Sequence, residues 1–292
     1  MATLGNPKNT LEIIRKYEFK FRKRFGQNFL VDENILRRIV GSAELGQDDC
    51  VLEIGPGIGT LTQYLAEAAG HVVAVEIDRD LVPILKEDTL AGYDNVTIIN
   101  EDILKTDLKA LSQEYNGGKP FSVVANLPYY ITTPIIMRLF EEDAPVKSVT
   151  VMVQKEVADR MQAEPGGKEY GALSLSVRYY AEAEIVTLVP PGAFIPRPKV
   201  GSAVIRLIKR KEPAVSVSDP EKLFRIIRAS FMQRRKTLQN ALSNDAGLSI
   251  EKKYTAEALR GMGLPETVRG EAMSLEEFAA FTERLNLENL HT

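Results

Sequence analysis

A tetrapeptide with the sequence Asn-Leu-Pro-Tyr occupies residues 126–129, directly after an apolar run, 121–125, that is typical of a buried strand. It is followed by Thr132, a residue that often begins helices, and by Pro134 in the expected first turn. An amide, a proline and an aromatic ring therefore lie in the loop after the carboxyl end of a strand. Ligands bind at that edge in open α/β sheets.

These residue types suit the transfer of a methyl group to the exocyclic amine of a planar base. Such a nitrogen is a poor nucleophile because its lone pair is delocalised into the ring. The side-chain oxygen of Asn126 and a backbone carbonyl can accept its two N–H groups and aim the lone pair. Pro128 stiffens the loop and Tyr129 offers a ring for stacking. An isolated Asn-x-Pro-Tyr is more often a simple strand-to-helix turn, so the interpretation depends on other motifs.

A glycine-rich turn between an expected strand and helix is the second motif, at residues 51–62. Gly55, Gly57 and Gly59 allow the backbone to approach a ligand, and the helix beyond has unpaired N–H groups. The spacing differs from the dinucleotide fingerprint, whose third glycine comes one position later. Glu76 follows Gly55 by 21 residues and can accept both hydroxyls of a ribose. Together they predict a cofactor that contains adenosine.

Three further segments each allow two interpretations. Gln27 and Asn28 could lie over a ligand or form a turn. Asp102, after the third expected strand, could accept the amino group of the cofactor's adenine or cap a helix. Phe194, on an extended proline-containing loop, could form a base pocket with Tyr129 or fill the edge of the sheet.

Charge is distributed unevenly along the 292 residues. The net charge is −3, but residues 1–40 carry +5 and residues 197–236 carry +9, so the rest carries −17. Two basic segments on an acidic body favour a bound polyanion. Residues 17–25 alternate basic and aromatic side chains, which is typical of nucleic-acid binding or of an arm packed on the body.

Composition argues against other kinds of site. One cysteine and two histidines make a zinc cluster, a histidine-based metal site or a catalytic triad improbable, so we expect no metal. No apolar stretch suits export or a membrane span, and we expect a cytoplasmic protein without a membrane partner.

The order of elements predicts an α/β fold. Strands alternate with helices up to Gly171, which indicates a doubly wound parallel sheet. Antiparallel-type strands follow, and then helices at 223–242, 255–262 and 275–285, whereas the first fifteen residues lack a period and are expected to be loose. The expected domains are a basic aromatic arm (1–25), a domain built on the parallel sheet (26–212) and a helical domain with a basic first helix (213–292).

Six segments in this order match one known family: Phe-Gly-Gln-Asn-Phe-Leu at 25–30, Glu-Ile-Gly-Pro-Gly-Ile-Gly at 53–59, Glu-Ile-Asp at 76–78, Asn-Leu-Pro-Tyr at 126–129, Phe-x-Pro-x-Pro-x-Val-x-Ser at 194–202 and Phe-x-Gln-Arg-Arg-Lys-Thr-Leu at 231–238. The chain resembles the ribosomal small-subunit RNA adenine dimethyltransferases from about Tyr17 to the C-terminal helices. The first and last segments make the resemblance specific.

The resemblance implies a Rossmann-like class I methyltransferase with a mostly parallel seven-stranded sheet and a small C-terminal α-helical domain. It implies S-adenosylmethionine as methyl donor. It also implies that two methyl groups reach N6 of each of two adjacent adenosines near the 3′ end of 16S rRNA, in the small ribosomal subunit or its precursor. The enzyme would also take part in maturation of the small subunit, and we expect a monomer.

The residues expected in each role follow from the motifs and the resemblance. Those around the cofactor are Gln27, Asn28, Leu30, Gly55, Gly57, Glu76, Ile77, Asp102 and Asn126. Those at the target adenine are Asn126, Leu127, Pro128, Tyr129 and Phe194. Those expected on RNA phosphates are Arg22, Lys23, Arg24, Arg197, Lys199, Arg234, Arg235 and Lys236.

Four alternatives remain at this point. A 23S rRNA adenine methyltransferase that confers macrolide resistance would share the fold and the tetrapeptide. A DNA adenine methyltransferase would favour an acidic first residue in the tetrapeptide, and a small-molecule methyltransferase would not need two basic segments. A mainly non-catalytic ribosome-assembly factor would not need Gly55, Glu76 and Asn126.

Overall fold

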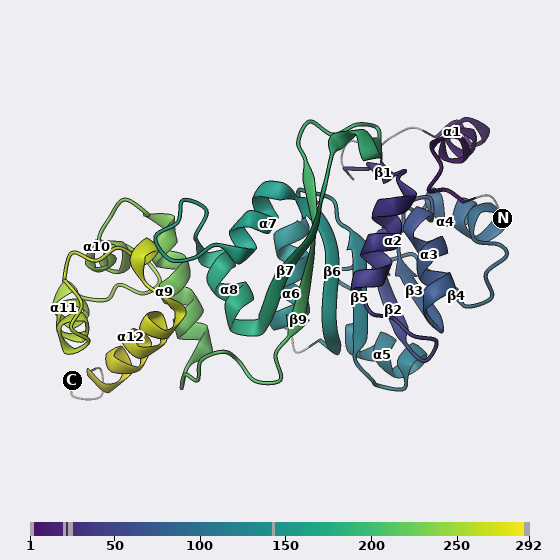
Figure 1. The fold of residues 1–292 in the computed structure, drawn as a ribbon. Helices are drawn as coiled ribbons and strands as arrows, with labels where there is room; N and C mark the ends of the chain where they lie inside the picture. Colours follow the sequence, from purple (N-terminus) through teal and green to yellow (C-terminus); the bar gives the residue numbers. More distant parts are fainter. Residues whose placement is uncertain (1–2, 20–21, 23–25, 142–143, 289–292) are drawn as a thin grey trace. The chain divides into compact units, whose positions relative to one another are not determined.

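The computed structural model describes residues 3–19, 22, 26–141 and 144–288, the last three by their backbone only. The chain forms two compact units (Figure 1). The first comprises residues 1–158 and 183–209, and the second comprises residues 159–182 and 210–292. Contacts therefore group residues 159–182 with the C-terminal helices, whereas the expected domain limits placed them with the sheet.

Within the described residues, seven strands form one sheet in the order β4-β3-β2-β5-β6-β9-β7. Their bounds are β2 (Cys50–Ile54), β3 (His71–Val75), β4 (Val96–Ile99), β5 (Phe121–Asn126), β6 (Val146–Gln154), β7 (Ala181–Val189) and β9 (Ser202–Lys209). The neighbouring strands β4, β3, β2, β5 and β6 run parallel to one another, and β9 pairs antiparallel with β6. The sequence prediction of a mostly parallel, doubly wound α/β sheet is confirmed.

The first unit also contains a set of helices and a short ribbon. The helices are α1 (Pro7–Lys16), α2 (Glu33–Ser42), α3 (Thr60–Ala68), α4 (Leu81–Ile84) continued by a π-helical turn (Leu85–Thr89), α5 (Leu108–Asn116), α6 (Thr132–Glu141) and α7 (Lys155–Gln162), whose last residues belong to the second unit. The ribbon pairs β1 (Phe29–Leu30) antiparallel with β8 (Phe194–Ile195), after a 3-10 turn (Pro191–Ala193).

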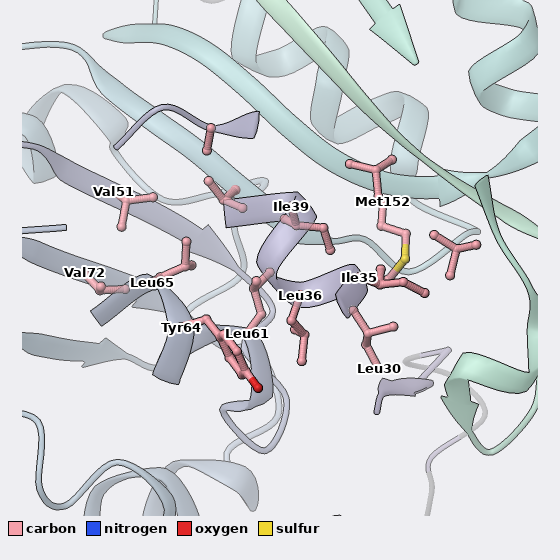
Figure 2. Packing of buried hydrophobic residues seen from close by; sticks show 14 of the residues in the cluster. Leu30, Ile35, Leu36, Ile39, Val51, Leu61, Tyr64, Leu65, Val72 and Met152 are labelled. Carbon is pink, nitrogen blue, oxygen red and sulfur yellow. The ribbon is translucent and has the colours of Figure 1, made fainter. Parts of the chain in front are cut away.

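An apolar core lies between the sheet and helices α2 and α3 (Figure 2). The side chains of Leu36 and Ile39 from α2 and of Leu65 from α3 are fully buried there, over Val51 and Val72 of the sheet. Asp32 caps α2 by accepting the amides of residues 34 and 35. The expected helix from about residue 32, with apolar residues on one face, is confirmed.

The N-terminal residues differ from the prediction. Residues 7–16 form α1, although the first fifteen residues were expected to be loose. The side chain of Asn6 accepts the amide of Lys8, Pro7 begins the helix, and Leu4 and Thr10 are buried. The dipeptide Asn-Pro is a helix-start signal that outweighed the weak period of this segment.

The second unit is helical. Its elements are α8 (Ala172–Tyr180), α9 (Pro220–Met232), α10 (Leu238–Ser243), α11 (Lys252–Gly261), a 3-10 turn (Gly270–Ala272) and α12 (Leu275–Glu288). Phe278 and Phe281 of α12 are fully buried against Leu223 and Ile227 of α9.

The single helix expected over residues 223–242 is wrong. Helix α9 ends at Met232 and α10 begins at Leu238. The amide of Lys236 donates to the carbonyl of Gln233 in the turn between them, and the amide of Leu238 donates to Val268 O at 2.8 Å. The amide of Leu238 therefore bonds to a distant carbonyl instead of to one in a continuous helix. The helical spacing of apolar residues runs on through this turn, which is why the sequence pattern did not reveal the break.

Within the described residues, no helix is long and apolar enough to cross a membrane.

Candidate functional site

A cavity in the first unit opens at the carboxyl ends of β2, β3 and β5. It is lined by Gly26, Gln27, Asn28, Phe29, Leu30, Glu53, Gly55, Pro56, Gly57, Thr60, Leu61, Glu76, Ile77, Leu81, Asn126, Leu127, Pro128, Tyr129 and Tyr130. Segments from four distant parts of the sequence thus meet at one edge of the sheet. This is the edge at which open α/β sheets bind ligands.

The glycine turn forms the floor of the cavity between β2 and α3. Gly57 has a φ of +62°, and a Cβ on it would lie 3.0 Å from Cε1 of Phe29. Its amide donates to Oε2 of Glu76 at 3.1 Å. Only glycine therefore permits both the left-handed backbone and the close approach of the Phe29 ring.

Glu76 directly follows β3 and carries a buried carboxyl group. Oε1 accepts the amide of Asp78 at 2.7 Å, and Oε2 accepts the amide of Gly57. Burial raises the pKa of Glu76 to about 7, although these two amides oppose the shift. Beside it, Ile77 is 46% exposed, which leaves an apolar face free for a planar ring. A carboxylate that accepts hydroxyl groups next to an apolar side chain suits an adenosine ribose and its base.

The tetrapeptide is held rigidly where β5 ends. The amide of Leu127 donates to Met152 O at 3.2 Å, and the hydroxyl of Thr132 at the start of α6 donates to Pro128 O at 3.1 Å. The hydroxyls of Tyr129 and Ser202 share a hydrogen bond of 2.7 Å. Tyr129 is half-buried, and this burial raises its pKa. Its ring is thus fixed at the rim of the cavity.

The segment with Gln27 and Asn28 contacts the tetrapeptide directly. Nδ2 of Asn126 donates to Asn28 O at 3.0 Å, and Nδ2 of Asn28 donates to Gly26 O at 3.0 Å. The sequence left open whether Gln27 and Asn28 form a turn or lie over a ligand. The two interpretations are compatible, because the side chain of Asn28 closes a turn and the two residues also line the cavity. Leu30 is buried beside it and reaches the same wall.

Glu53 is a residue that sequence reasoning missed. It is fully buried, and its Oε2 has no hydrogen-bond partner among the residues that the structure describes. Burial raises the pKa of Glu53 to about 8; the nearby hydroxyl of Thr62 opposes this shift, and the charge of Glu76 adds to it. The available signal was a lone acidic residue inside an apolar strand, two positions before Gly55. Such a group is costly to bury without a partner, which favours a ligand there.

Two predicted residues lie away from the cavity lining, as far as the described residues define it. Oδ1 of Asp102 accepts a hydrogen bond from the amide of Leu104 at 3.0 Å, but this bond closes a turn, because α5 begins only at Leu108 and is capped by Asp107. Phe194 is 4% exposed, pairs with Leu30 in the short ribbon, and belongs to the apolar core. Their contacts with adenine stay predictions, and for Phe194 such a contact requires the ring to leave this packing.

The basic residues have different environments. Arg22 binds Asp78 and Asp80, so its guanidinium is engaged within the protein. Lys23 and Arg24 lie outside the described residues. Arg197 and Lys199 in the first unit are exposed, as are Arg235 and Lys236 in the second. Arg234 donates to Lys168 O and lies 3.4 Å from Glu271. Within the described residues, no cluster of three or more histidine, cysteine or acidic side chains could hold a metal ion.

Comparison with known proteins identifies the family. Residues 18–280 match the ribosomal RNA adenine dimethylases. The chain belongs to this family. The dimethylase is 60% identical over 283 residues to the ribosomal RNA small subunit methyltransferase A of Lachnoclostridium phytofermentans, covering 97% of this chain and 98% of that protein. It is 51% identical over 292 residues to the protein of the same name from Bacillus mycoides, covering 99% and 100%.

Solved structures show the same fold. A dimethyladenosine transferase from Plasmodium falciparum superposes with a TM-score of 0.75 at 27% identity, covering 89% of this chain and 98% of that one. The 23S rRNA methyltransferase ErmE superposes with a TM-score of 0.67 at 29% identity, covering 88% and 99%. The dimethylase is therefore an S-adenosylmethionine-dependent enzyme of class I fold that methylates adenine in ribosomal RNA. These predictions from the sequence are confirmed.

Proposed function

We propose that this dimethylase converts two adjacent adenosines near the 3′ end of 16S rRNA to N6,N6-dimethyladenosine. The substrate is the small ribosomal subunit or its precursor in the cytoplasm, and the enzyme acts as a monomer. The observation that carries the proposal is that relatives at 51–60% identity, aligned over nearly the whole chain, are named as small-subunit methyltransferases.

The residues of the cavity fit S-adenosylmethionine. Gly55 has a φ of +70°, and a Cβ there would meet nothing within 4 Å among the described residues, so the backbone is open to a ligand at this point of the cavity. The carboxyl group of Glu76 can accept the ribose hydroxyls. Glu53 offers a buried oxygen without a partner in the described part of the chain. When bound, the cofactor supplies an electrophilic methyl group on its sulfonium.

Asn126 and Tyr129 act on the acceptor. Asn28 O is only an acceptor, so the side-chain nitrogen of Asn126 must face it. Oδ1 of Asn126 is then left to accept an N–H group of the target amine, which aims the nitrogen lone pair. The ring of Tyr129, held through its hydroxyl by Ser202, provides a face for the base. Rate acceleration comes from positioning and desolvation rather than from a general base.

An adenosine reaches this cavity only when it leaves its stack, so accessible loops and assembly intermediates are the preferred substrates. The exposed Arg197 and Lys199 in the first unit, and Arg235 and Lys236 in the second, are proposed to bind phosphates.

The test is methylation of undermethylated small subunits with radiolabelled S-adenosylmethionine, followed by mapping of the modified nucleotides. We expect dimethyladenosine at two neighbouring positions near the 3′ end of 16S rRNA. Undermethylated large subunits are assayed in parallel, because the structural similarity to ErmE makes 23S rRNA the competing substrate. Label in 23S rRNA alone contradicts the proposal. Tight binding of small subunits without label indicates an assembly factor instead.

A further inference from the structure

Asp78 is a buried carboxylate at the tip of β3, next to the proposed ribose site. Its side chain is 1% exposed. Oδ2 accepts a hydrogen bond from Nε2 of Gln27 at 2.9 Å, and Oδ1 accepts one from Nη1 of Arg22 at 3.2 Å. Both partners come from the N-terminal segment, more than 50 residues away in the sequence. A buried carboxylate needs such donors, so these contacts fix where Arg22 and Gln27 lie.

Gln27 uses both ends of its side-chain amide. Nε2 donates to Asp78, while Oε1 accepts the backbone amide of Arg22 at 2.9 Å. Neither end can be reversed, since the carboxylate only accepts and the amide only donates. The side chain of Gln27 therefore links the backbone of Arg22 to Asp78 in one arrangement.

The next residue transmits this arrangement to the acceptor site. The carbonyl of Asn28 accepts a hydrogen bond from Nδ2 of Asn126 at 3.0 Å. The side chain of Asn28 closes a turn by donating to Gly26 O. A displacement of the peptide after Gln27 would move the only acceptor, among the described residues, that orients the amide of Asn126.

We infer that Asp78 is a positioning residue for methyl transfer. Through Gln27 and the Asn28 carbonyl it sets the orientation of the Asn126 side chain, and so links the cofactor edge of the cavity to the acceptor edge. The inference rests on the proposed role of Asn126 as the group that accepts the target amine.

The test exchanges the carboxylate and the amide. Gln27→Glu places a second carboxylate opposite that of Asp78. We expect kcat at saturating S-adenosylmethionine to fall about 10- to 100-fold, because small displacements of a positioning group have effects of that size. Adding Asp78→Asn restores a donor–acceptor pair. The new amide at position 78 can donate to the new carboxylate at position 27, which still accepts the amide of Arg22. We expect the double variant to regain most of the lost kcat.

The control is Glu44→Gln, which removes an ion pair with Arg206 elsewhere in the first unit and should leave kcat unchanged. A wild-type kcat in Gln27→Glu overturns the inference, and so does a double variant no more active than Gln27→Glu alone. If Gln27→Glu does not fold, Gln27→Ala replaces it, and an unchanged kcat in that variant overturns the inference equally. Failure of the proposed function is distinguishable, because the wild-type enzyme would then not label small subunits.

Discussion

At the scale of single residues, the side-chain oxygen of Asn126 is the group on which the proposed chemistry depends. The side-chain nitrogen of Asn126 donates to the Asn28 carbonyl, which leaves the oxygen to accept the target amine. Asn126→Ala removes this acceptor, and we expect kcat to fall by about 10²- to 10³-fold. Binding of rRNA should stay nearly unchanged, because phosphate contacts dominate affinity. Single-turnover methylation and filter binding measure the two effects.

Asn244→Ala is the matched control, since Asn244 is exposed in the second unit and should affect neither quantity. Wild-type turnover in Asn126→Ala would contradict the proposed role of the tetrapeptide.

Glu53 makes the stability of the enzyme depend on pH. Burial raises its pKa from 4.5 to about 8. Between these values the folded state keeps a proton that the unfolded state has lost, so the free energy of unfolding falls as pH rises through this window. Glu53→Gln removes the titration. Between about pH 5 and about pH 8.5 the variant should gain on the order of 4 kcal/mol in free energy of unfolding relative to wild type. Thermal unfolding of both proteins without cofactor tests this, and parallel pH profiles would contradict it.

At the scale of elements, the glycine turn between β2 and α3 combines strain with close packing. Gly57→Ala places a Cβ 3.0 Å from the Phe29 ring at a φ of +62°. We expect a loss of about 1–3 kcal/mol in stability and a roughly 10-fold weaker affinity for S-adenosylmethionine. Calorimetry measures both.

Gly166→Ala is the control for this prediction. Gly166 has a φ of +81°, but a Cβ there would meet nothing within 4 Å in the described part of the chain. The stability of the Gly166→Ala variant should fall, whereas its affinity for S-adenosylmethionine should stay unchanged. Equal cofactor affinities for the two variants would mean that the turn at Gly57 does not shape the cofactor site.

At the scale of the whole molecule, basic side chains from both units are proposed to bind RNA. Arg235 is exposed, whereas Arg234 also contacts Lys168 and Glu271 in its own unit. Glutamine at both arginine positions should weaken RNA binding and reduce the slope of log K against log salt by about 1 to 2, since each phosphate contact contributes about 1.

Cofactor affinity should not change in this variant. Lys253→Gln, at a lysine paired with Glu251 in the same unit, is the control and should keep the wild-type slope. An unchanged slope in the arginine variant would show that these arginines do not meet phosphates.

The sequence alone was sufficient for the parallel sheet and for most of the cavity, because both follow from local patterns. Apolar runs and helix caps determine strands such as residues 71–75 and helices such as α2. The edge of a parallel sheet then brings together the glycine turn, Glu76 and Asn126, since each follows a strand.

Tertiary structure decided the features that depend on distant partners. The contact of Gln27 with Asp78, the burial of Phe194 and the burial of Glu53 each require residues far apart in sequence to meet. The break after Met232 has the same cause, because the amide of Leu238 finds its acceptor at Val268. Local periodicity carries no information about such pairs, since burial and long-range hydrogen bonds arise only when the elements pack.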